Sequence, residues 1–133
     1  MRVYYQDTDA GGVVFHAQYL AFMERARSEL LNAAQIDLAR FTASHGVLFL
    51  VHHISVTYHR PALLNDLLTV SAEVAKIGRA SLVFRQRVER SGELLVEADV
   101  SLALVDRPSM KPTRMPEELA TALGAGQTKA LKR

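Results

Sequence analysis

The sequence predicts an α+β domain in which one long helix packs against an antiparallel sheet. Apolar residues recur at helical spacing in one segment near the start of the chain. The residues that follow switch to the period of two that is typical of strands, and no second long helix interrupts them. Because the helix and the sheet would each have one apolar face, laying the helix across the sheet buries both faces.

The elements can be placed in order along the chain. The β-prone residues 2–6 predict a short first strand, and a helix is expected from about Ala17 to Ala34, where apolar residues lie three and four apart. Four consecutive strands are expected after it, which with the first strand make a five-stranded antiparallel sheet. Their ranges are Val47–His59, Leu67–Ile77, Leu82–Arg90 and Leu94–Val105. Pro116 and Gly124 suit the start and the end of a last helix.

The length of 133 residues predicts a single domain, at 1–123, followed by a basic tail at 124–133 that we expect to be disordered. Residues 107–133 have a net charge of +4, and the rest of the chain has a net charge of −2. An acidic body without an aromatic and basic stripe argues against nucleic-acid binding. A solvated tail is the favoured explanation of this charge, and attraction to an anionic partner is the alternative.

Several classes of protein are excluded by composition. The chain has no Cys, which rules out disulfides, thiolate metal sites and a Cys nucleophile. No segment approaches the ~20 apolar residues that span a bilayer, and the polar start of the chain is unlike a signal peptide. These features predict a cytoplasmic protein. An exposed sheet edge would need protection, and pairing with a second copy is one way to provide it.

Candidate chemistry lies between Tyr5 and Tyr19, where Asp7 and Asp9 precede two glycines and His16 stands at the start of the long helix. The first turn of a helix offers unpaired N–H donors, which can stabilise a carbonyl oxygen as it becomes negative. A carboxylate nearby can attack that carbonyl or deprotonate water.

Each of these residues also has a simpler interpretation. The two aspartates can serve as turn residues, and His16 as a structural histidine. A divalent metal between the aspartates is disfavoured because no further acidic ligand follows in the loop. Tyr19 is expected in the core.

A longer motif narrows these alternatives. The run R-V-Y-Y-x-D-T-D-A-G-G-V-V-F-H-x-x-Y resembles the signature of the 4-hydroxybenzoyl-CoA thioesterase family, whose members have the hot-dog fold. The similarity continues in E-R-A-R-S-E-L-L at 24–31 and S-L-V-F-x-Q-R at 81–87, and it covers nearly all of residues 2–120. Within the family, the chain is most similar to the acyl-CoA thioesterases associated with the Tol-Pal system.

The resemblance implies a hydrolase that cleaves an acyl-CoA thioester without a metal or an organic cofactor. Asp9 matches the family's catalytic carboxylate, as nucleophile or general base, and His16 matches the position whose backbone N–H polarises the thioester carbonyl. The residues that match supporting positions are Tyr5, Asp7, Gly12 and Val13. Arg79 and Ser81 match the turn that binds the nucleotide of coenzyme A.

Such proteins form homodimers or homotetramers with sites at subunit interfaces, and acyl carrier protein remains open as the thiol carrier. Two other functions compete with hydrolysis. One is a non-catalytic acyl-CoA sensor or scaffold with the same fold. The other is a hot-dog dehydratase, against which the Asp9 motif argues. The sequence does not select an acyl group.

Overall fold

The predicted long helix is confirmed as α1, Gln18–Ala33, in the computed structural model, which describes residues 1–9, 11–126 and 131–132. One face of α1 is buried through Phe22, Met23, Ala26 and Leu30, and it packs against strands β2 and β3. Burying a large apolar side chain stabilises a fold by roughly 1.5–3 kcal/mol, so this face holds α1 on the sheet. The side chains have the helical spacing from which the helix was predicted.

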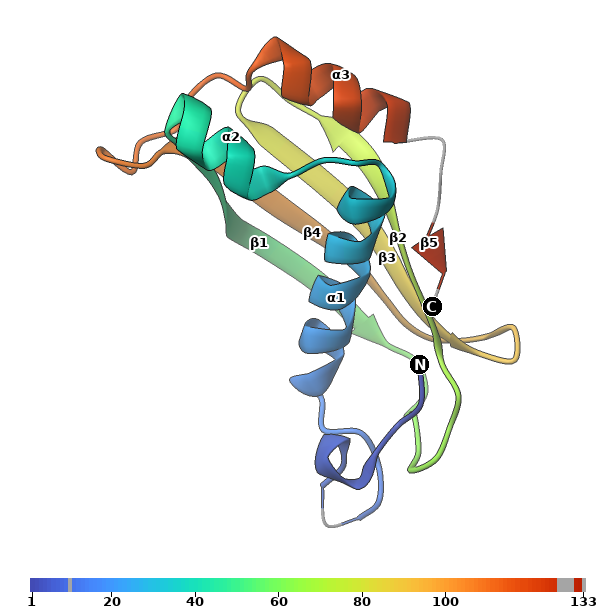
Figure 1. Cartoon of the computed structure of the whole chain (residues 1–133). Coiled ribbons are helices and arrows are strands. Elements are labelled where there is room, and N and C mark those ends of the chain that lie inside the picture. The colour runs from blue at the N-terminus through green and yellow to red at the C-terminus, as the bar shows by residue number, and fades with distance from the viewer. Residues whose placement is uncertain (10, 127–130, 133) are drawn as a thin grey trace.

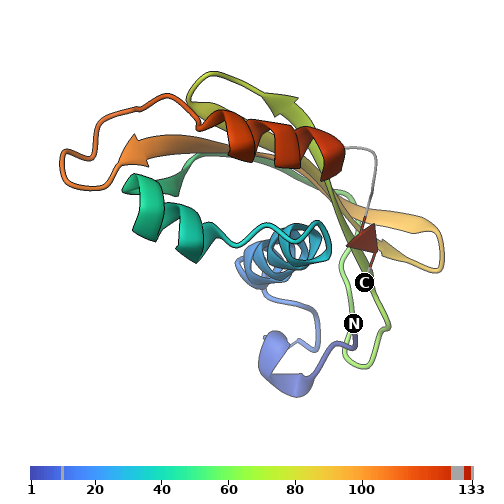
Figure 2. The same ribbon diagram turned by 45° about the horizontal axis from the view of Figure 1, so that its top comes forward.

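The four predicted long strands are also confirmed, with ends that differ from the prediction by at most two residues. They are β1 (Val47–Tyr58), β2 (Thr69–Ile77), β3 (Ser81–Arg90) and β4 (Glu93–Asp106). A two-residue strand, β5 (Leu131–Lys132), pairs with β2. The antiparallel sheet has the order β1-β4-β3-β2-β5, so β1 forms one edge. Figure 2 shows the sheet curving around α1.

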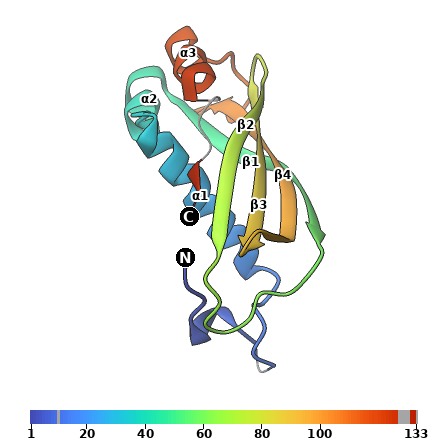
Figure 3. The same cartoon turned by 90° about the vertical axis from the view of Figure 1, so that its right-hand side faces the viewer.

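The helices all lie on one side of the sheet, and its other face is uncovered within the described chain (Figure 3). Besides α1 they are α2 (Leu38–His45) and α3 (Glu117–Gly126). Helix α3 was predicted with nearly these bounds, whereas α2 was not predicted. Among the described residues, no helix has the length and apolar composition needed to cross a membrane.

The predicted first strand at residues 2–6 is wrong. Val3 pairs with the segment before β2, because its N–H donates to the Asp66 carbonyl at 2.8 Å, but this pairing does not continue beyond Val3. The Asp7 carboxylate accepts a hydrogen bond from the Tyr4 N–H at 3.0 Å, and the Asp7 N–H donates to the Tyr4 carbonyl at 2.9 Å. These two local bonds close a 3-10 turn, η1 (Tyr5–Asp7), and this turn replaces strand pairing.

The predicted disordered tail falls partly outside the described residues. Residues 124–126 belong to α3 and Leu131–Lys132 form β5, while 127–130 and 133 are not described. The boundary at residue 123 and the disorder of the tail therefore stay predictions.

One buried polar group joins α1 to the sheet. Gln86 on β3 has no exposed surface, and its Nε2 donates to the Met23 carbonyl of α1 at 2.8 Å. Its Oε1 accepts a hydrogen bond from Nη1 of Arg27 at 2.7 Å. Burial lowers the pKa of Arg27. Because every polar atom of Gln86 is satisfied, the amide fixes where α1 lies along β3.

Candidate active site

The predicted catalytic loop is a tight reversal of the chain before α1. The Asp9 N–H donates to the Val13 carbonyl at 2.9 Å, and the Gly12 N–H donates back to the Asp9 carbonyl at 3.1 Å. Gly12 has a φ of 81°, which a residue with a side chain adopts only with strain. This geometry sets Asp9 beside Val13, three residues before His16.

The two aspartates have different environments. Asp7 is only 6% exposed, and its carboxylate is used in the η1 turn. Its carbonyl also accepts a hydrogen bond from the Phe15 N–H at 3.0 Å. Asp9 is exposed, and its Oδ1 accepts the Gly11 N–H at 2.8 Å. Within the described chain, Oδ2 of Asp9 has no hydrogen-bond partner, so this oxygen is available to attack a carbonyl or to take a proton.

The start of α1 carries donors that are not used by the helix. Ala17 is the N-cap and supplies no side-chain hydrogen bond. The N–H groups of His16 and Ala17 have no acceptor among the described residues, and both lie at the positive end of the helix dipole. The His16 side chain is exposed, with its ring 4.6 Å from that of Phe15.

Two tyrosines that flank this helix start differ in exposure. Tyr19 is 2% exposed and belongs to the core, as expected. Its hydroxyl oxygen accepts the Ala62 N–H at 2.9 Å. Burial raises the pKa of Tyr19 more than this hydrogen bond lowers it. Tyr58, which was not predicted to belong to the site, donates its hydroxyl to the His16 carbonyl at 3.1 Å.

A second segment, residues 60–66, supports the loop. The Val14 N–H donates to the Ala62 carbonyl at 2.9 Å, and the Leu64 N–H donates to the Gly12 carbonyl at 3.1 Å. Val13 forms an isolated bridge with Leu63. The predicted catalytic loop therefore takes its position from residues about fifty places later in the chain, which local sequence patterns do not reveal.

Ion pairs anchor the 60–66 segment to the turn between β3 and β4. Arg90 binds Asp66 at 2.7 Å and Glu93 at 2.8 Å, and Arg60 binds Glu93 at 3.1 Å. Burial works to raise the pKa of Asp66, but the Leu63 N–H and the Arg90 guanidinium outweigh it and hold that pKa below its usual value. The carboxylate form of Asp66 is thus the one that the fold stabilises.

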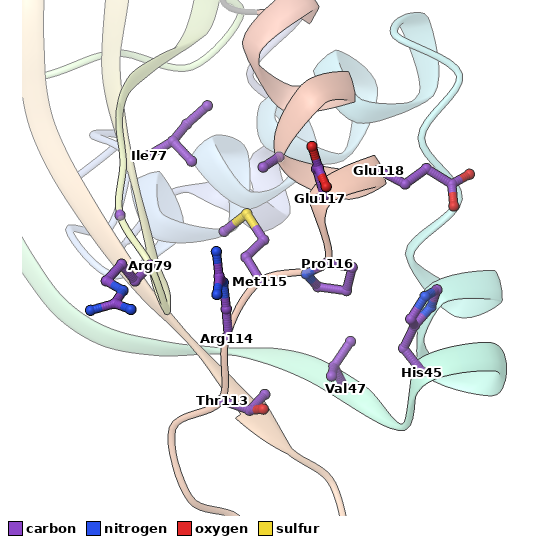
Figure 4. Close-up of a pocket in the computed structure, with 12 residues that line it drawn as sticks. His45, Val47, Ile77, Arg79, Thr113, Arg114, Met115, Pro116, Glu117 and Glu118 are labelled. Atoms are coloured by element: carbon purple, nitrogen blue, oxygen red, sulfur yellow. The ribbon is translucent and has the colours of Figure 1, made fainter.

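Arg79 and Ser81 lie elsewhere: Arg79 is in the turn between β2 and β3, and Ser81 is the first residue of β3. Arg79 lines an open cavity of about 1030 Å³ together with Arg114, which was not predicted, and with His45 and Val47 (Figure 4). Ser81 does not line it. A Cβ at Gly78 would collide with the Ser81 side chain, so these two residues form the tight connection that was expected between the strands.

The structure does not bring the two halves of the predicted site together within one chain. The loop before α1 and the β2–β3 turn lie at opposite ends of the molecule (Figure 1). The 16 residues of α1, at ~1.5 Å per residue, set about 24 Å between its ends. Among the described residues, no group of three His, Asp or Glu side chains is arranged to hold a metal ion.

Comparison with known proteins places the chain in a family. A sequence model described as "Thioesterase superfamily" matches residues 11–97, a range that contains Gly12, Val13, His16 and Arg79. The chain belongs to the thioesterase superfamily. The match starts after Asp9, so the role of this residue is not part of that finding.

Relatives of this thioesterase superfamily chain cover almost its whole length. It is 44% identical over 120 residues to the acyl-CoA thioester hydrolase YbgC of Escherichia coli O6:H1, covering 90% of this chain and 89% of that protein. It is 42% identical over 122 residues to the acyl-CoA thioesterase YbgC of Haemophilus influenzae, covering 92% and 90%.

The fold has solved counterparts. Slr0204 of Synechocystis, a 1,4-dihydroxy-2-naphthoyl-CoA thioesterase, superposes with a TM-score of 0.85 at 23% identity, covering 93% of this chain and 92% of that one. At this identity the likeness concerns the fold alone. It confirms the expected hot-dog architecture of a long helix wrapped by an antiparallel sheet.

Proposed function

We propose that the chain hydrolyses an acyl-CoA thioester to a free acid and coenzyme A at the loop before α1. The observation that carries the proposal is that, among the described residues, Oδ2 of Asp9 and the N–H groups of His16 and Ala17, seven and eight positions later, have no hydrogen-bond partner. A carboxylate beside oxyanion donors is the arrangement that acyl transfer requires. The two YbgC relatives, named for this activity, support the assignment.

The proposed hydrolysis uses the N–H donors at the start of α1 and the carboxylate of Asp9. The thioester oxygen would accept hydrogen bonds from the start of α1, which stabilise its negative charge in the tetrahedral intermediate. Asp9 either attacks the carbonyl carbon, giving an anhydride that water then hydrolyses, or removes a proton from the attacking water. In both routes the C–S bond breaks and the sulfur leaves as the thiol. Tyr5, Asp7, Gly12 and Val13 would keep the loop in shape.

Coenzyme A would be held at the other end of the molecule. Arg79 and Arg114 line the same cavity, and two guanidinium groups suit the phosphates of the nucleotide. Ser81 would contribute by fixing the turn that carries Arg79. Figure 4 shows both arginines on one side of the cavity and His45 with Glu118 on the other.

A second copy of the chain would join the two halves. Strand β1 has no neighbour on its outer side within the described residues, and Leu50 and Val51 on it are 39% and 52% exposed. Antiparallel pairing across a two-fold axis would set the Tyr58 end of one β1 beside the Val47 end of the other. Since Tyr58 contacts His16 and Val47 lines the Arg79 cavity, each site would take residues from both copies.

Release of free thiol from a panel of acyl-CoAs tests the proposal. We expect wild-type turnover, and a loss of at least ~10²-fold in Asp9→Ala, the scale of one acid–base or nucleophilic group. Asp99→Ala is the matched control, because Asp99 is an exposed carboxylate paired with Arg85 on a strand away from the loop. A folded Asp9→Ala protein with near-normal turnover would refute the mechanism.

Binding without turnover would identify the competing function. Acyl-CoA that binds tightly to the wild type but is never cleaved would favour a sensor or scaffold of the same fold. The use of acyl carrier protein, the association with the Tol-Pal system and the cytoplasmic location stay predictions, each open to direct measurement. The acyl group is what the panel of acyl-CoAs would identify.

A further inference from the structure

Tyr58 closes the start of α1 from the side of the sheet. It is the last residue of β1, and its side chain is 46% exposed. The hydroxyl donates to the His16 carbonyl at 3.1 Å, across 42 residues of sequence. The ring lies 5.6 Å from that of Tyr19 at an angle of 63°, an edge-on contact. A half-exposed tyrosine thus has both its ring and its hydroxyl engaged.

The surroundings of Tyr58 keep its hydroxyl in place. The backbone after Tyr58 is tied to β4, because the N–H groups of His59 and Arg60 both donate to the Leu95 carbonyl, at 2.8 and 3.1 Å. The Tyr19 ring on which Tyr58 packs is buried and is itself held by the Ala62 N–H. The hydroxyl therefore reaches His16 from a rigid framework, which is what a precise hydrogen bond requires.

We propose that Tyr58 is a positioning residue, which orients and polarises the His16–Ala17 peptide so that the first N–H groups of α1 point at the reacting carbonyl. The carbonyl of His16 and the N–H of Ala17 belong to one conjugated peptide group. A hydrogen bond accepted at the oxygen strengthens the N–H as a donor, because hydrogen bonds in a chain polarise one another.

The preceding peptide group, between Phe15 and His16, is also polarised by a hydrogen bond to its carbonyl. The Gln18 N–H donates to the Phe15 carbonyl at 2.8 Å, and the N–H of that peptide is the one on His16. Two successive free donors therefore sit on peptides whose carbonyls already accept hydrogen bonds. One of these two bonds comes from the helix itself and the other only from Tyr58, so removing the Tyr58 hydroxyl alters one donor and leaves the backbone intact.

The inference rests on the proposed hydrolysis, and its test is Tyr58→Phe, which removes a single oxygen atom. With the acyl-CoA that the wild type cleaves fastest, we expect kcat to fall about 5- to 10-fold and KM to stay unchanged, because the donor acts on charge that develops only in the transition state. Tyr4→Phe is the control, since Tyr4 is 63% exposed and its side chain makes no capping hydrogen bond to the described residues of the η1 turn.

A second measurement does not depend on turnover. In Tyr58→Phe the NMR shifts of the His16 carbonyl carbon and the Ala17 amide nitrogen should move, while the thermal unfolding midpoint falls by no more than a few degrees, the scale of one hydrogen bond. Unchanged shifts, or an unchanged kcat in an active enzyme, would overturn the role of Tyr58 and leave the hydrolysis standing. A wild type without turnover would overturn both.

Discussion

Mixing two defective variants tests whether Asp9 and Arg79 act on one substrate from different copies of the chain. Asp9→Ala should abolish the chemistry, and Arg79→Ala should weaken the binding of coenzyme A. Each variant alone is then nearly inactive at low substrate concentration. Asp9 belongs to the loop before α1 and Arg79 to the β2–β3 turn, which lie at opposite ends of the molecule (Figure 1). Helix α1 alone is about 24 Å long. Antiparallel pairing of β1 would bring the Asp9 end of one copy to the Arg79 end of the other.

The expected recovery follows from counting sites. When the two variants exchange subunits freely in equal amounts, about half of the dimers contain one copy of each. Each mixed dimer has one site with both Asp9 and Arg79 intact and one site with neither. The mixture should therefore regain about one quarter of the wild-type activity, and a tetramer built from such dimers gives the same fraction.

Thiol release is measured after the variants are unfolded together in urea and refolded, with each variant refolded alone as the control. The mass in solution is recorded for every sample. Sites contained within one chain predict no recovery, because every chain keeps its own defect. An absence of recovery in a mixture that has demonstrably formed mixed dimers would therefore refute the shared site, and a monomeric mass would do so directly.

Two further predictions concern the framework of the site. Gln86→Leu should lower the free energy of unfolding by about 2 kcal/mol, since it leaves the Met23 carbonyl and the Arg27 guanidinium without their buried partner; an unchanged urea midpoint would contradict this. The pKa of Asp66 in the folded chain lies below its usual value of about 3.9. As the pH falls, the unfolded chain therefore takes up this proton before the folded chain does. The stability that Asp66 contributes is complete above the unfolded pKa and is lost as the pH falls through the folded pKa. The thermal midpoint of Asp66→Asn should therefore vary less than that of the wild type between pH 5 and 3, roughly the range in which carboxylates titrate, and parallel curves would contradict the assignment.

The parts of the fold that were predicted are those whose burial repeats along the chain. Helix α1 and strands β2, β3 and β4 each bury one face, and that face leaves a period in the sequence, whereas β1 buries only Val47. The strand predicted at residues 2–6 is wrong although its residues favour strands. The Asp7 carboxylate closes a local turn there, and the strand propensities of Tyr4 and Tyr5 do not predict this turn.

The missed helix α2 had readable end signals. Asp37 caps its start by accepting the Arg40 N–H at 3.2 Å, and Gly46 ends it with a φ of 67°. Its eight residues give barely two turns, too few for an apolar period to stand out. Short helices of this kind are recognised by their caps rather than by their pattern.

The site was predictable only where it is local. Asp9, Gly12 and His16 lie within eight residues, so a motif describes them. The contacts of Tyr58 and the ion pair between Arg90 and Asp66 join residues 24 to 42 positions apart, and such pairs follow from sheet register rather than from spacing. The sequence therefore indicated the groups that we propose react, but not the groups that hold them.

Strand β1 connects the two inferences, because it carries Tyr58 at one end and Val47, beside the Arg79 cavity, at the other. In the mixed dimer, the intact site takes its loop and its Tyr58 from the Arg79→Ala chain. Adding Tyr58→Phe to that chain should lower the recovered activity about 5- to 10-fold, the effect expected of the weakened donor. Adding Tyr58→Phe to the Asp9→Ala chain should leave the recovered activity unchanged, since Tyr58 of that chain contacts only the loop that lacks the Asp9 carboxylate. Equal losses in both mixtures would mean that Tyr58 acts on the dimer rather than on its own helix start.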